Sequence, residues 1–238
     1  MQIDYDVKKT NLSKAIADNL EEMIVHNSQQ LGEKLPSEQS LADNFGVSRN
    51  VIRESMKLLL ERGLVIVRAG GGAYISKPDP NILTNMIARF IAMDGINDMG
   101  AHDVRILLET ESCRLTTLNA TDKDFDELQL IIDEMIKVFD DVEHRVKLDI
   151  QFHTRIAEMS GNRLLTLFVG SMAILIQTLI KQAVRSKLGS DSAIDYHARI
   201  LSAMRTRNVN LATELMSAHL QESKRRYISV SKNSTSAI

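Results

Sequence analysis

The sequence of 238 residues lacks tryptophan and has few aromatic side chains, one cysteine and three prolines. A single cysteine excludes a disulfide within the chain and is typical of proteins from a reducing cytosol. Aromatics make up 4% of the residues and hydrophobic residues 44%, a balance that favours a mostly helical protein with a sizeable core. The formal net charge is −2, so the bulk charge indicates no polyanionic partner.

Signals for export or membrane insertion are also missing. The opening residues MQIDYDVKKT contain no apolar segment of the kind that signal peptides carry. The longest apolar stretch, residues 164–180, is interrupted by Thr, Gly, Ser and Gln and is short for a membrane span. We therefore interpret it as a buried core helix and expect a soluble, cytoplasmic protein.

Proline marks the expected boundary between two domains. All three prolines lie within the first 80 residues, and Pro78 and Pro80 in KPDPN each disfavour helix at the preceding residue. The expected divisions are a first domain at 1–77, a linker at 78–81, a second domain at 82–228 and a flexible tail at 229–238.

The first domain is expected to contain three helices and a hairpin. Ser37 and Ser48 are placed to cap its second and third helices, and Gly63 to end the third. The segments LVIVR and AYI enclose a glycine turn and predict two short strands. Nearly every later segment is helix-periodic with short breaks, which predicts an antiparallel bundle and a mostly α fold. Long helices are expected at 11–27, 81–93, 102–118, 122–140, 143–160, 163–186, 191–206 and 208–227.

A short helix, a turn at Gly46 and a second helix opened by Ser48 form the layout of a helix-turn-helix. In such motifs the first residues of the second helix reach base edges, and here these are Ser48, Arg49, Asn50 and Arg53. Arginine can pair with guanine, and asparagine with adenine, through two hydrogen bonds. The alternative is an ordinary polar helix start on a solvated face.

The charge of the first domain is strongly polarised. Residues 1–47 carry a net charge of −4 and residues 48–77 a net charge of +4. The positive half contains the second helix of the motif and the hairpin, where DNA phosphates would lie. Arg68 stands at the base of a hairpin tip with Gly70 and Gly71, whose lack of side-chain bulk suits insertion beside a DNA backbone.

Four polar residues interrupt apolar helical stretches in the second domain. Asp149 and His153 lie one turn apart in DIQFH, and His197 and His219 occupy similar settings on two later helices. Three imidazoles and one carboxylate form a ligand set suited to Zn²⁺, Ni²⁺ or Mn²⁺. The alternative is that each histidine is a hydrogen-bonded core residue. The other three histidines are expected at the surface or in turns: His26, His102 and His144.

The segment LPSEQSLADNFGVSRNVIRESMKLLLERGLVIVRAGGGAYI resembles the winged helix-turn-helix of the GntR family of bacterial transcription regulators, and the likeness extends over residues 11–77. The resemblance implies operator contacts from the second helix and the wing: Ser48, Arg49, Asn50, Arg53, Gly70 and Gly71. Many members have arginine after LPSE and use it on DNA. This chain has Gln39 there, which can form a hydrogen bond but carries no charge.

Residues 81–227 resemble the FCD ligand-binding domain of the FadR subfamily, through the motifs VRILLE, DIQFH, SGN, YHARILSAM and AxxLMxxHL. The resemblance implies that a divalent metal, zinc before nickel or manganese, is held by four residues: Asp149, His153, His197 and His219. It also implies that a small organic acid binds against the metal and that Arg105 pairs with its carboxylate. Without the motif, Arg105 would be interpreted as a solvated helix charge. FadR itself binds long acyl-CoA and lacks the metal set.

Together these features predict a transcription regulator of the repressor type, not an enzyme. We expect a homodimer whose recognition helices read a pseudo-palindromic operator, with an affinity that the acid changes. One alternative is a metalloenzyme that uses the same four residues to activate water, although no HExxH motif is present. Another is a structural nucleic-acid-binding protein with an inert bundle, from which no metal would copurify.

Two further residues have structural interpretations. Cys113 lies on an apolar-periodic helix and is expected to be a small buried residue. Asn162, in SGN, is expected to be a turn and cap residue and not a ligand contact. Neither residue therefore enters the candidate site.

Overall fold

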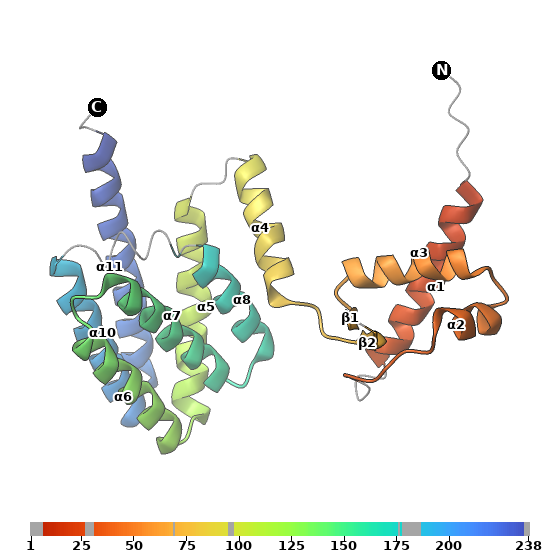
Figure 1. Ribbon diagram of the computed structural model, residues 1–238. Coiled ribbons are helices and arrows are strands. Elements are labelled where there is room, and N and C mark those ends of the chain that lie inside the picture. The colour runs from red at the N-terminus through yellow and green to blue at the C-terminus, as the bar shows by residue number, and fades with distance from the viewer. Residues whose placement is uncertain are drawn as a thin grey trace. The chain divides into compact units, whose positions relative to one another are not determined.

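The computed structural model describes residues 7–26, 31–68, 70–94, 98–175, 177 and 187–235. It divides into two compact units, Met1–Ile82 and Leu83–Ile238. Both are built mainly of helices, and a single hairpin lies in the first (Figure 1). The expected fold class is confirmed: a helix-turn-helix with a hairpin, followed by an all-helical region.

The first unit contains three helices and two strands. They are α1 (Val7–His26), α2 (Glu38–Phe45), α3 (Arg49–Glu61), β1 (Val65–Arg68) and β2 (Gly72–Ile75). The side chains of Ser37 and Ser48 accept hydrogen bonds from the amides of Ser40 and Val51, so both act as the expected N-caps. Gly46 adopts the left-handed conformation, with φ of 64°, and thereby turns the chain from α2 into α3.

Apolar side chains hold the helix-turn-helix and the hairpin together. The two strands pair antiparallel, from Val65 opposite Ile75 to Arg68 opposite Gly72. Ile52 and Leu59 of α3 are fully buried against α1 and the base of the hairpin. Arg62 ties the end of α3 to α1 through ion pairs of 2.7 Å with Asp18 and 2.5 Å with Glu21. The recognition helix therefore has a rigid base.

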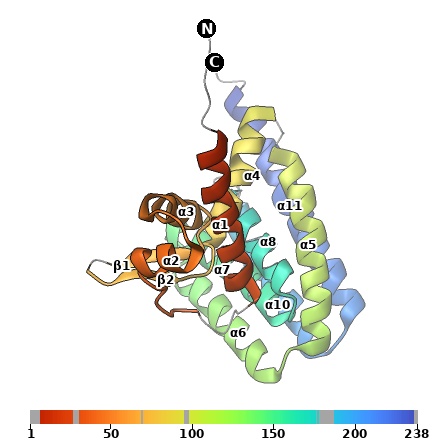
Figure 2. The ribbon, with the colours of Figure 1, turned by 90° about the vertical axis from the view of Figure 1, so that its right-hand side faces the viewer.

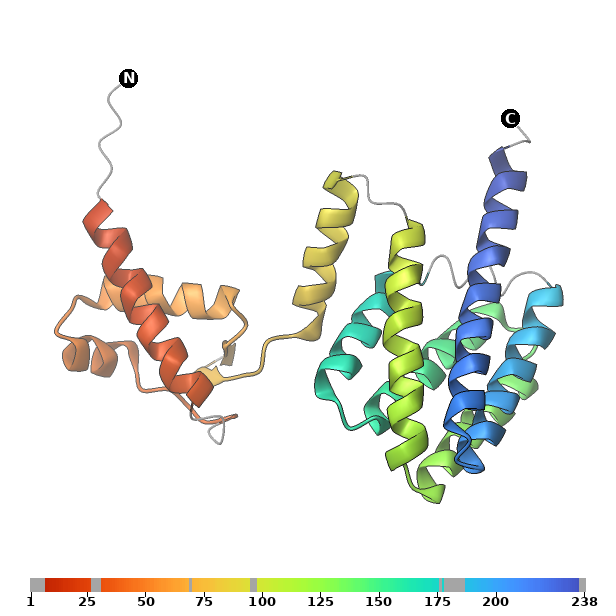
Figure 3. The same cartoon turned by 180° about the vertical axis from the view of Figure 1, so that it is seen from behind.

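The second unit is a bundle of antiparallel and crossing helices. Figures 2 and 3 show α5 and α11 side by side over much of their length. The described helices of this region are α4 (Pro80–Asp94), α5 (Asp98–Asn119), α6 (Asp122–Lys137), α7 (Val142–Met159), α8 (Arg163–Leu175), α10 (Lys187–Arg205) and α11 (Val209–Thr235). Among the described residues, no helix is both long enough and apolar enough to cross a membrane.

Helices α5 and α7 run in the same direction along their contact. Near the start of the contact, Glu109 on α5 meets His153 on α7. Further along, the hydroxyl of Thr116 donates a 2.6 Å hydrogen bond to the carbonyl of Ile156. Polar residues on the inner face of α5 therefore lie level with those on the inner face of α7.

Helix α11 runs in the opposite direction to α5. Its preceding turn contains Arg207, which has a φ of 55° and donates hydrogen bonds of 2.9 and 2.6 Å to the carbonyls of Thr117 and Ala120. At the other end, Lys224 of α11 pairs with Asp103 of α5 at 2.5 Å. Arg207 thus satisfies carbonyls at the end of α5, which offsets its strained backbone.

Several smaller expectations can now be compared with the structure. Cys113 is fully buried, as expected, and burial raises the pKa of its thiol to about 12. The Asn162 side chain caps α8 by accepting from the amides of Leu164 and Leu165 at 3.1 and 3.4 Å, which confirms its role as a cap residue. His102 was expected at the surface, and this is wrong, because it is only 1% exposed on the inner face of α5.

Two expected boundaries also differ from the structure. Helix α4 begins at Pro80, inside the expected linker at 78–81, because proline is well tolerated at the first position of a helix. Helix α11 continues to Thr235, into the expected flexible tail, since that segment contains neither glycine nor proline to stop it. The expected helix at 163–186 is present as α8 up to Leu175, and most of its remainder lies outside the described residues.

Candidate functional site

Four buried side chains converge in the interior of the bundle. Asp149 and His153 come from α7, His197 from α10 and His219 from α11, and none is more than 7% exposed. The Nε2 atoms of the three histidines form a triangle with sides of 3.2, 3.2 and 3.3 Å. The Oδ1 atom of Asp149 lies 3.5 Å from Nε2 of His197, and all four ligand atoms lie within 4.8 Å of one another.

The spacing of these atoms fits ligands of a single ion. Two nitrogens bound tetrahedrally to one zinc ion, each about 2.0–2.1 Å away, are about 3.3–3.4 Å apart. The observed triangle is close to that value, and the fourth atom is an oxygen of the kind that zinc, nickel and manganese accept. The four residues predicted as ligands therefore lie where they could hold a metal.

Hydrogen bonding alone does not account for the three histidines. Burial first, and neighbouring histidines and Arg105 second, lower the pKa of His197 and His219 well below the usual value. Both rings are therefore neutral, with one N–H each. His153 places Nδ1 2.6 Å from a Glu109 carboxylate oxygen, off the ideal N–H direction, which favours its proton on Nδ1. The neutral rings of His197 and His219 supply at most two Nε2 protons to the three Nε2 contacts.

Glu109 is a member of the site that the sequence prediction missed. It is 1% exposed, and its carboxylate contacts both the guanidinium of Arg105 and the imidazole of His153. Burial opposes ionisation, but the charge of Arg105 and the contacts with His153 outweigh it and lower the pKa of Glu109 to about 2. A carboxylate on the far nitrogen of a metal-binding histidine fixes its tautomer and orientation.

Arg105 is buried beside this cluster and is not a solvated helix charge. It is 2% exposed, its Nε donates to Glu109, and its Nη2 lies 3.9 Å from Oδ2 of Asp149. The guanidinium therefore lies next to one of the four candidate ligands. An anion bound beside that ligand would be within reach of Arg105. The motif VRILLE could have indicated Glu109 as well. Arg105 and Glu109 are four residues apart in it and therefore share one face of a helix.

A groove in the first unit brings together five of the eight residues predicted to contact DNA: Gln39, Arg49, Arg53, Gly70 and Gly71. Lys34 and Lys57 line the same groove and were not predicted. Lys34 pairs with Tyr74 of the hairpin in an isolated bridge. The sequence pattern did not indicate this pairing. The groove thus has four cationic side chains, three of them on α3 and the fourth, Lys34, on the segment that pairs with the hairpin.

The remaining predicted DNA contacts lie around this groove. Ser48 caps α3, and Asn50 is exposed in the first turn of the helix beside a second, smaller hollow. The guanidinium of Arg68 lies 4.3 Å from the centre of the Tyr74 ring, in a cation–π contact. At Gly71 an added Cβ would come within 3.0 Å of the Tyr74 hydroxyl, so a bulkier residue would disturb this contact.

Glu38 is an acidic residue among these cations that the sequence prediction also missed. Its carboxylate accepts a 2.9 Å hydrogen bond from Nε of Arg49 and lies 3.8 Å from Nε of Arg53. Gln39 turns instead to Asp43, with a 2.9 Å hydrogen bond. An intramolecular carboxylate therefore engages both arginines of α3.

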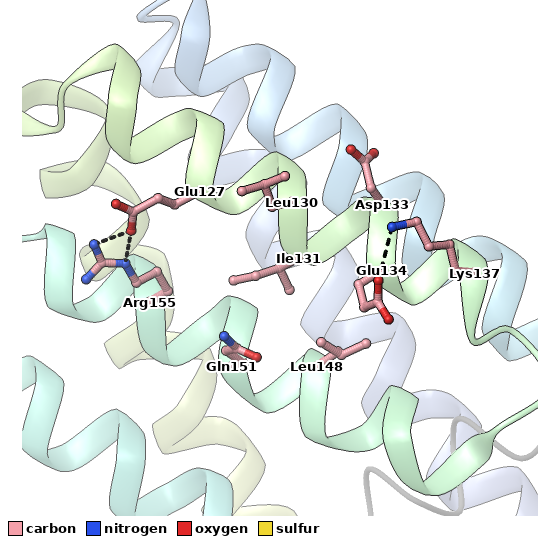
Figure 4. Close-up of a pocket in the computed structure, with 9 residues that line it drawn as sticks. All are labelled: Glu127, Leu130, Ile131, Asp133, Glu134, Lys137, Leu148, Gln151 and Arg155. Atoms are coloured by element: carbon pink, nitrogen blue, oxygen red, sulfur yellow. Dashed lines mark hydrogen bonds and ion pairs between the residues drawn. The ribbon is translucent and has the colours of Figure 1, made fainter.

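Another groove lies on the surface between α6 and α7, away from the histidine cluster (Figure 4). Its charged side chains are already paired. Glu127 bonds Arg155 at 2.5 Å, Glu134 bonds Lys137 at 3.2 Å, and Asp133 accepts from Gln129 at 2.8 Å. This groove offers no convergent ligand set, so the buried cluster is the better candidate site in the described part of the bundle.

A helix-turn-helix with a cationic groove, in one chain with a helical unit that has a buried ligand cluster, defines a two-domain DNA-binding regulator. Residues 12–75 match the bacterial regulatory proteins of the gntR family, and residues 101–222 match the FCD domain. The chain therefore belongs to the GntR family and contains an FCD domain. It is a DNA-binding transcription regulator and not an enzyme, and the metalloenzyme alternative is set aside.

Relatives of known name agree with this assignment. The HTH-type transcriptional regulator LutR of Bacillus subtilis is 29% identical over 203 residues, which cover 83% of this chain and 93% of LutR. The HTH-type transcriptional repressor NanR of Klebsiella aerogenes is 27% identical over 240 residues, covering 96% and 90%. The structure is similar to that of Streptococcus agalactiae GntR, with a TM-score of 0.65 and 27% identity over 90% of this chain and 99% of that one.

Proposed function

We propose that the second unit binds one divalent metal ion through Asp149, His153, His197 and His219. The observation that carries this proposal is the triangle of Nε2 atoms with sides of 3.2–3.3 Å, closed by a buried carboxylate. Zinc is the first candidate, and nickel and manganese accept the same ligands. Glu109 would hold His153 in the ligating tautomer.

We further propose that a small carboxylate binds against this metal and Arg105. Zinc can expand to five ligands, and the octahedral preference of manganese leaves two positions beyond the four protein ligands. Arg105 is buried within 3.9 Å of Asp149, so an acid bound at an open position would lie close to its guanidinium. Arginine suits this role because its planar fork matches a carboxylate.

For the first unit we propose operator recognition by the groove and its surroundings. Arg49, Arg53 and Asn50 would read base edges, and Ser48 and Gln39 would contact the backbone. The hairpin, with Arg68, Gly70 and Gly71, would approach the minor groove. Two copies would read a pseudo-palindromic site as a homodimer in the cytoplasm, and repression is supported by the repressor named among the relatives.

Metal analysis of the purified full-length protein tests the first proposal. Elemental analysis should find about one ion per chain in the parent, and His219→Ala should lose it. The matched control is His144→Ala, since His144 is an exposed histidine of α7. Unchanged metal content in His219→Ala would refute the ligand set. The operator affinity of the metal-free variant should stay near that of the parent, because the groove lies in the other unit.

A thermal-shift screen of small carboxylic acids, with and without chelator, tests the second proposal. An acid that binds through the metal should raise the melting temperature only in the metal-loaded protein. The same acid should change operator affinity roughly 5- to 150-fold, which corresponds to a coupling of ~1–3 kcal/mol. Acids that stabilise the chelated protein equally would contradict a role for the metal in ligand binding.

A further inference from the structure

The hairpin of the first unit has two faces, and only one of them lines the cationic groove. Val67 of β1 and Ala73 of β2 lie opposite each other and line that groove. Successive side chains of a strand point to opposite faces, so Arg68 and Tyr74 belong to the other face. Neither of these two residues lines the groove. The outer face of the hairpin is therefore a separate surface.

A third extended segment brings Lys34 onto this outer face. Three backbone hydrogen bonds of 2.9 Å join residues 32–35 to β2. They flank Lys34 and Tyr74, which form the kind of antiparallel pair in which the two side chains lie closest and share one face. Tyr74 also lies opposite Ile66 of β1. The outer face thus has Tyr74 at its centre, with Lys34 on one side and Ile66 on the other.

Two cationic side chains reach the same short stretch of β2 on this face. Arg68 lies opposite Gly72 in the register, and its guanidinium carbon is 4.3 Å from the centre of the Tyr74 ring. A Cβ added at Gly72 would come within 3.1 Å of Cε of Lys34 and 3.8 Å of its Nζ. Gly72 therefore leaves room for the lysine side chain, and the ammonium lies beside the residue that Arg68 faces.

Neither of these cations is neutralised by an acidic side chain. Arg49 and Arg53 of the groove both engage Glu38. Lys34 and Arg68, by contrast, are exposed and form no ion pair with any residue that the structure describes. Like charges gathered on one face without a counter-charge favour an external anion. The stacked ring also holds the guanidinium of Arg68 in one place before any anion binds.

A DNA phosphate is the anion that this position would meet. The minor groove of B-DNA is only about 6 Å wide, so a hairpin tip inserted there has a phosphate backbone on either side. Arg49 and Arg53 lie on the groove side of the hairpin, and Lys34 and Arg68 supply positive charge on its outer face. Arginine binds a phosphate through its planar fork, and lysine binds it as a point charge.

We propose that Lys34 and Arg68 together hold a DNA phosphate on the outer face of the hairpin, and that Tyr74 positions the guanidinium. The inference rests on the proposed operator recognition and deepens it, because it adds a backbone contact beyond the bases that α3 would read. A phosphate contact carries no sequence information of its own. It would fix the hairpin on the DNA and strengthen binding to every duplex.

DNA titrations of the full-length protein at several salt concentrations test the role of Lys34. The probes are a duplex that the parent protein selects from a random-sequence library and a random duplex of equal length. Lys34→Ala should weaken binding to both by ~3- to 10-fold near physiological salt, and lower the slope of log affinity against log salt by about 0.9. Lys34→Arg should keep most of the affinity. Lys147→Ala, at an exposed lysine of α7, should change neither quantity.

A pair of substitutions at Tyr74 tests its positioning role. Tyr74→Phe keeps the ring against the Arg68 guanidinium, whereas Tyr74→Leu removes the ring and keeps an apolar side chain. The leucine variant should therefore lose affinity for both duplexes, and the phenylalanine variant should not. In the background of Arg68→Ala, Tyr74→Leu should cause no further loss, which separates positioning of Arg68 from a general effect on the fold.

The outcomes separate this phosphate site from the operator recognition on which it rests. An unchanged salt slope in Lys34→Ala, or equal affinities of Tyr74→Phe and Tyr74→Leu, would overturn the proposal and leave recognition by α3 in place. A loss in Lys34→Ala confined to the selected duplex would also overturn it, because Lys34 would then contact a base. If the parent binds both duplexes equally and Arg49→Ala changes neither, operator recognition fails and the phosphate site fails with it.

Discussion

The two units of this regulator use their charged residues in opposite ways. In the first, Arg49 and Arg53 have side chains 59% and 51% exposed, and both face a partly exposed Glu38. In the second, the side chains of Arg105 and Glu109 are each 2% exposed. An exposed ion pair contributes ~0–1 kcal/mol, whereas breaking a buried one by removing a partner costs ~3–5 kcal/mol.

This difference in exposure indicates where each unit would bind its partner, at the surface in the first unit and in the interior in the second. Arginines that read DNA would have to be reachable from solvent, as Arg49 and Arg53 are, and exposed contacts such as theirs with Glu38 contribute little to stability. A buried ion pair is no more stabilising than apolar residues of similar size, and is often less so. Because such a pair gives the fold no clear advantage, its presence beside three convergent histidines supports a binding role in the interior.

The largest expected effect is the loss of one partner from the buried pair. Glu109→Ala leaves the Arg105 guanidinium buried without its partner and should lower the free energy of unfolding by ~3–5 kcal/mol. It also removes the carboxylate from His153, so metal affinity should fall roughly 10- to 100-fold. Urea unfolding followed by circular dichroism gives the first quantity, and competition with a chelator gives the second.

Two further variants make this test sharper. Glu111→Ala removes an exposed carboxylate that pairs with Arg114 at 2.7 Å, and it should leave the unfolding midpoint close to that of the parent. The double variant with Arg105→Met and Glu109→Leu should regain stability but not the response to acids. If Glu109→Ala unfolded no more easily than Glu111→Ala, the contrast between buried and exposed pairs would not hold.

The second prediction concerns acid pH, where only the bundle should respond strongly. His102 is buried among Arg105, Lys224, Glu109 and Asp103, and its pKa in the folded protein is lowered to about 4. The unfolded chain binds a proton near pH 6.5, so stability is full above that value and falls as the pH drops from 6.5 to 4. The loss from this residue should approach ~3 kcal/mol below pH 4.

Measurement of unfolding free energy against pH, in metal-free protein, checks this expectation. His102→Leu cannot bind the proton, so its curve should be flatter than that of the parent between pH 4 and 6.5. His144→Leu is the exposed control and should keep the slope of the parent. Parallel curves for the parent and His102→Leu would mean that His102 keeps an ordinary pKa.

The sequence predicted the helices and their faces better than it predicted the partners of buried charges. Apolar periodicity located most helices, because the period of 3.6 residues is set by the backbone. The buried cluster could be predicted because Asp149, His153 and His219 interrupt apolar faces where polar side chains are unusual. Helix ends were harder, as at Pro80 and Thr235, because a helix extends wherever no residue stops it.

Residues whose role depends on a tertiary neighbour could not be identified from the sequence. Glu109 is ordinary on a helix until His153 of another helix lies 2.6 Å away. His102 reads as a polar surface residue because it stands next to the charged Asp103, and its burial follows from the packing of α5. Lys34 lies in the cationic groove of the first unit, where its segment forms a bridge to Tyr74 on a strand about forty residues later. Such pairings arise from packing, and one sequence contains no record of them.

The third prediction moves to the exposed charges of the first unit. Arg49→Ala should weaken operator binding by ~1–3 kcal/mol if Arg49 pairs with a guanine, and it should barely affect random DNA. The measurement is a pair of titrations at one fixed salt concentration. Arg199→Ala, an exposed arginine of α10 that pairs with Asp195 at 3.3 Å, is the matched control. An equal loss on both DNAs would show that Arg49 contacts only phosphate.

The smallest effect is expected from Glu38, whose exposed pairs with Arg49 and Arg53 both lie in the first unit. Glu38→Gln keeps the shape but removes the negative charge that engages Arg49 and Arg53, so binding to random DNA should tighten by less than about 10-fold. Operator affinity should change less, because the specific complex already releases both arginines from Glu38.

The ratio of specific to non-specific affinity should therefore fall in Glu38→Gln, whereas folding stability should stay within ~1 kcal/mol of the parent. Glu134→Gln is the matched control, because Glu134 pairs with Lys137 at 3.2 Å on α6 and does not line the cationic groove. A strong loss of operator affinity in Glu38→Gln would contradict the view that Glu38 competes with DNA for the two arginines. In that case Glu38 would hold Arg49 in position for its base, much as Glu109 would hold His153 for the proposed metal.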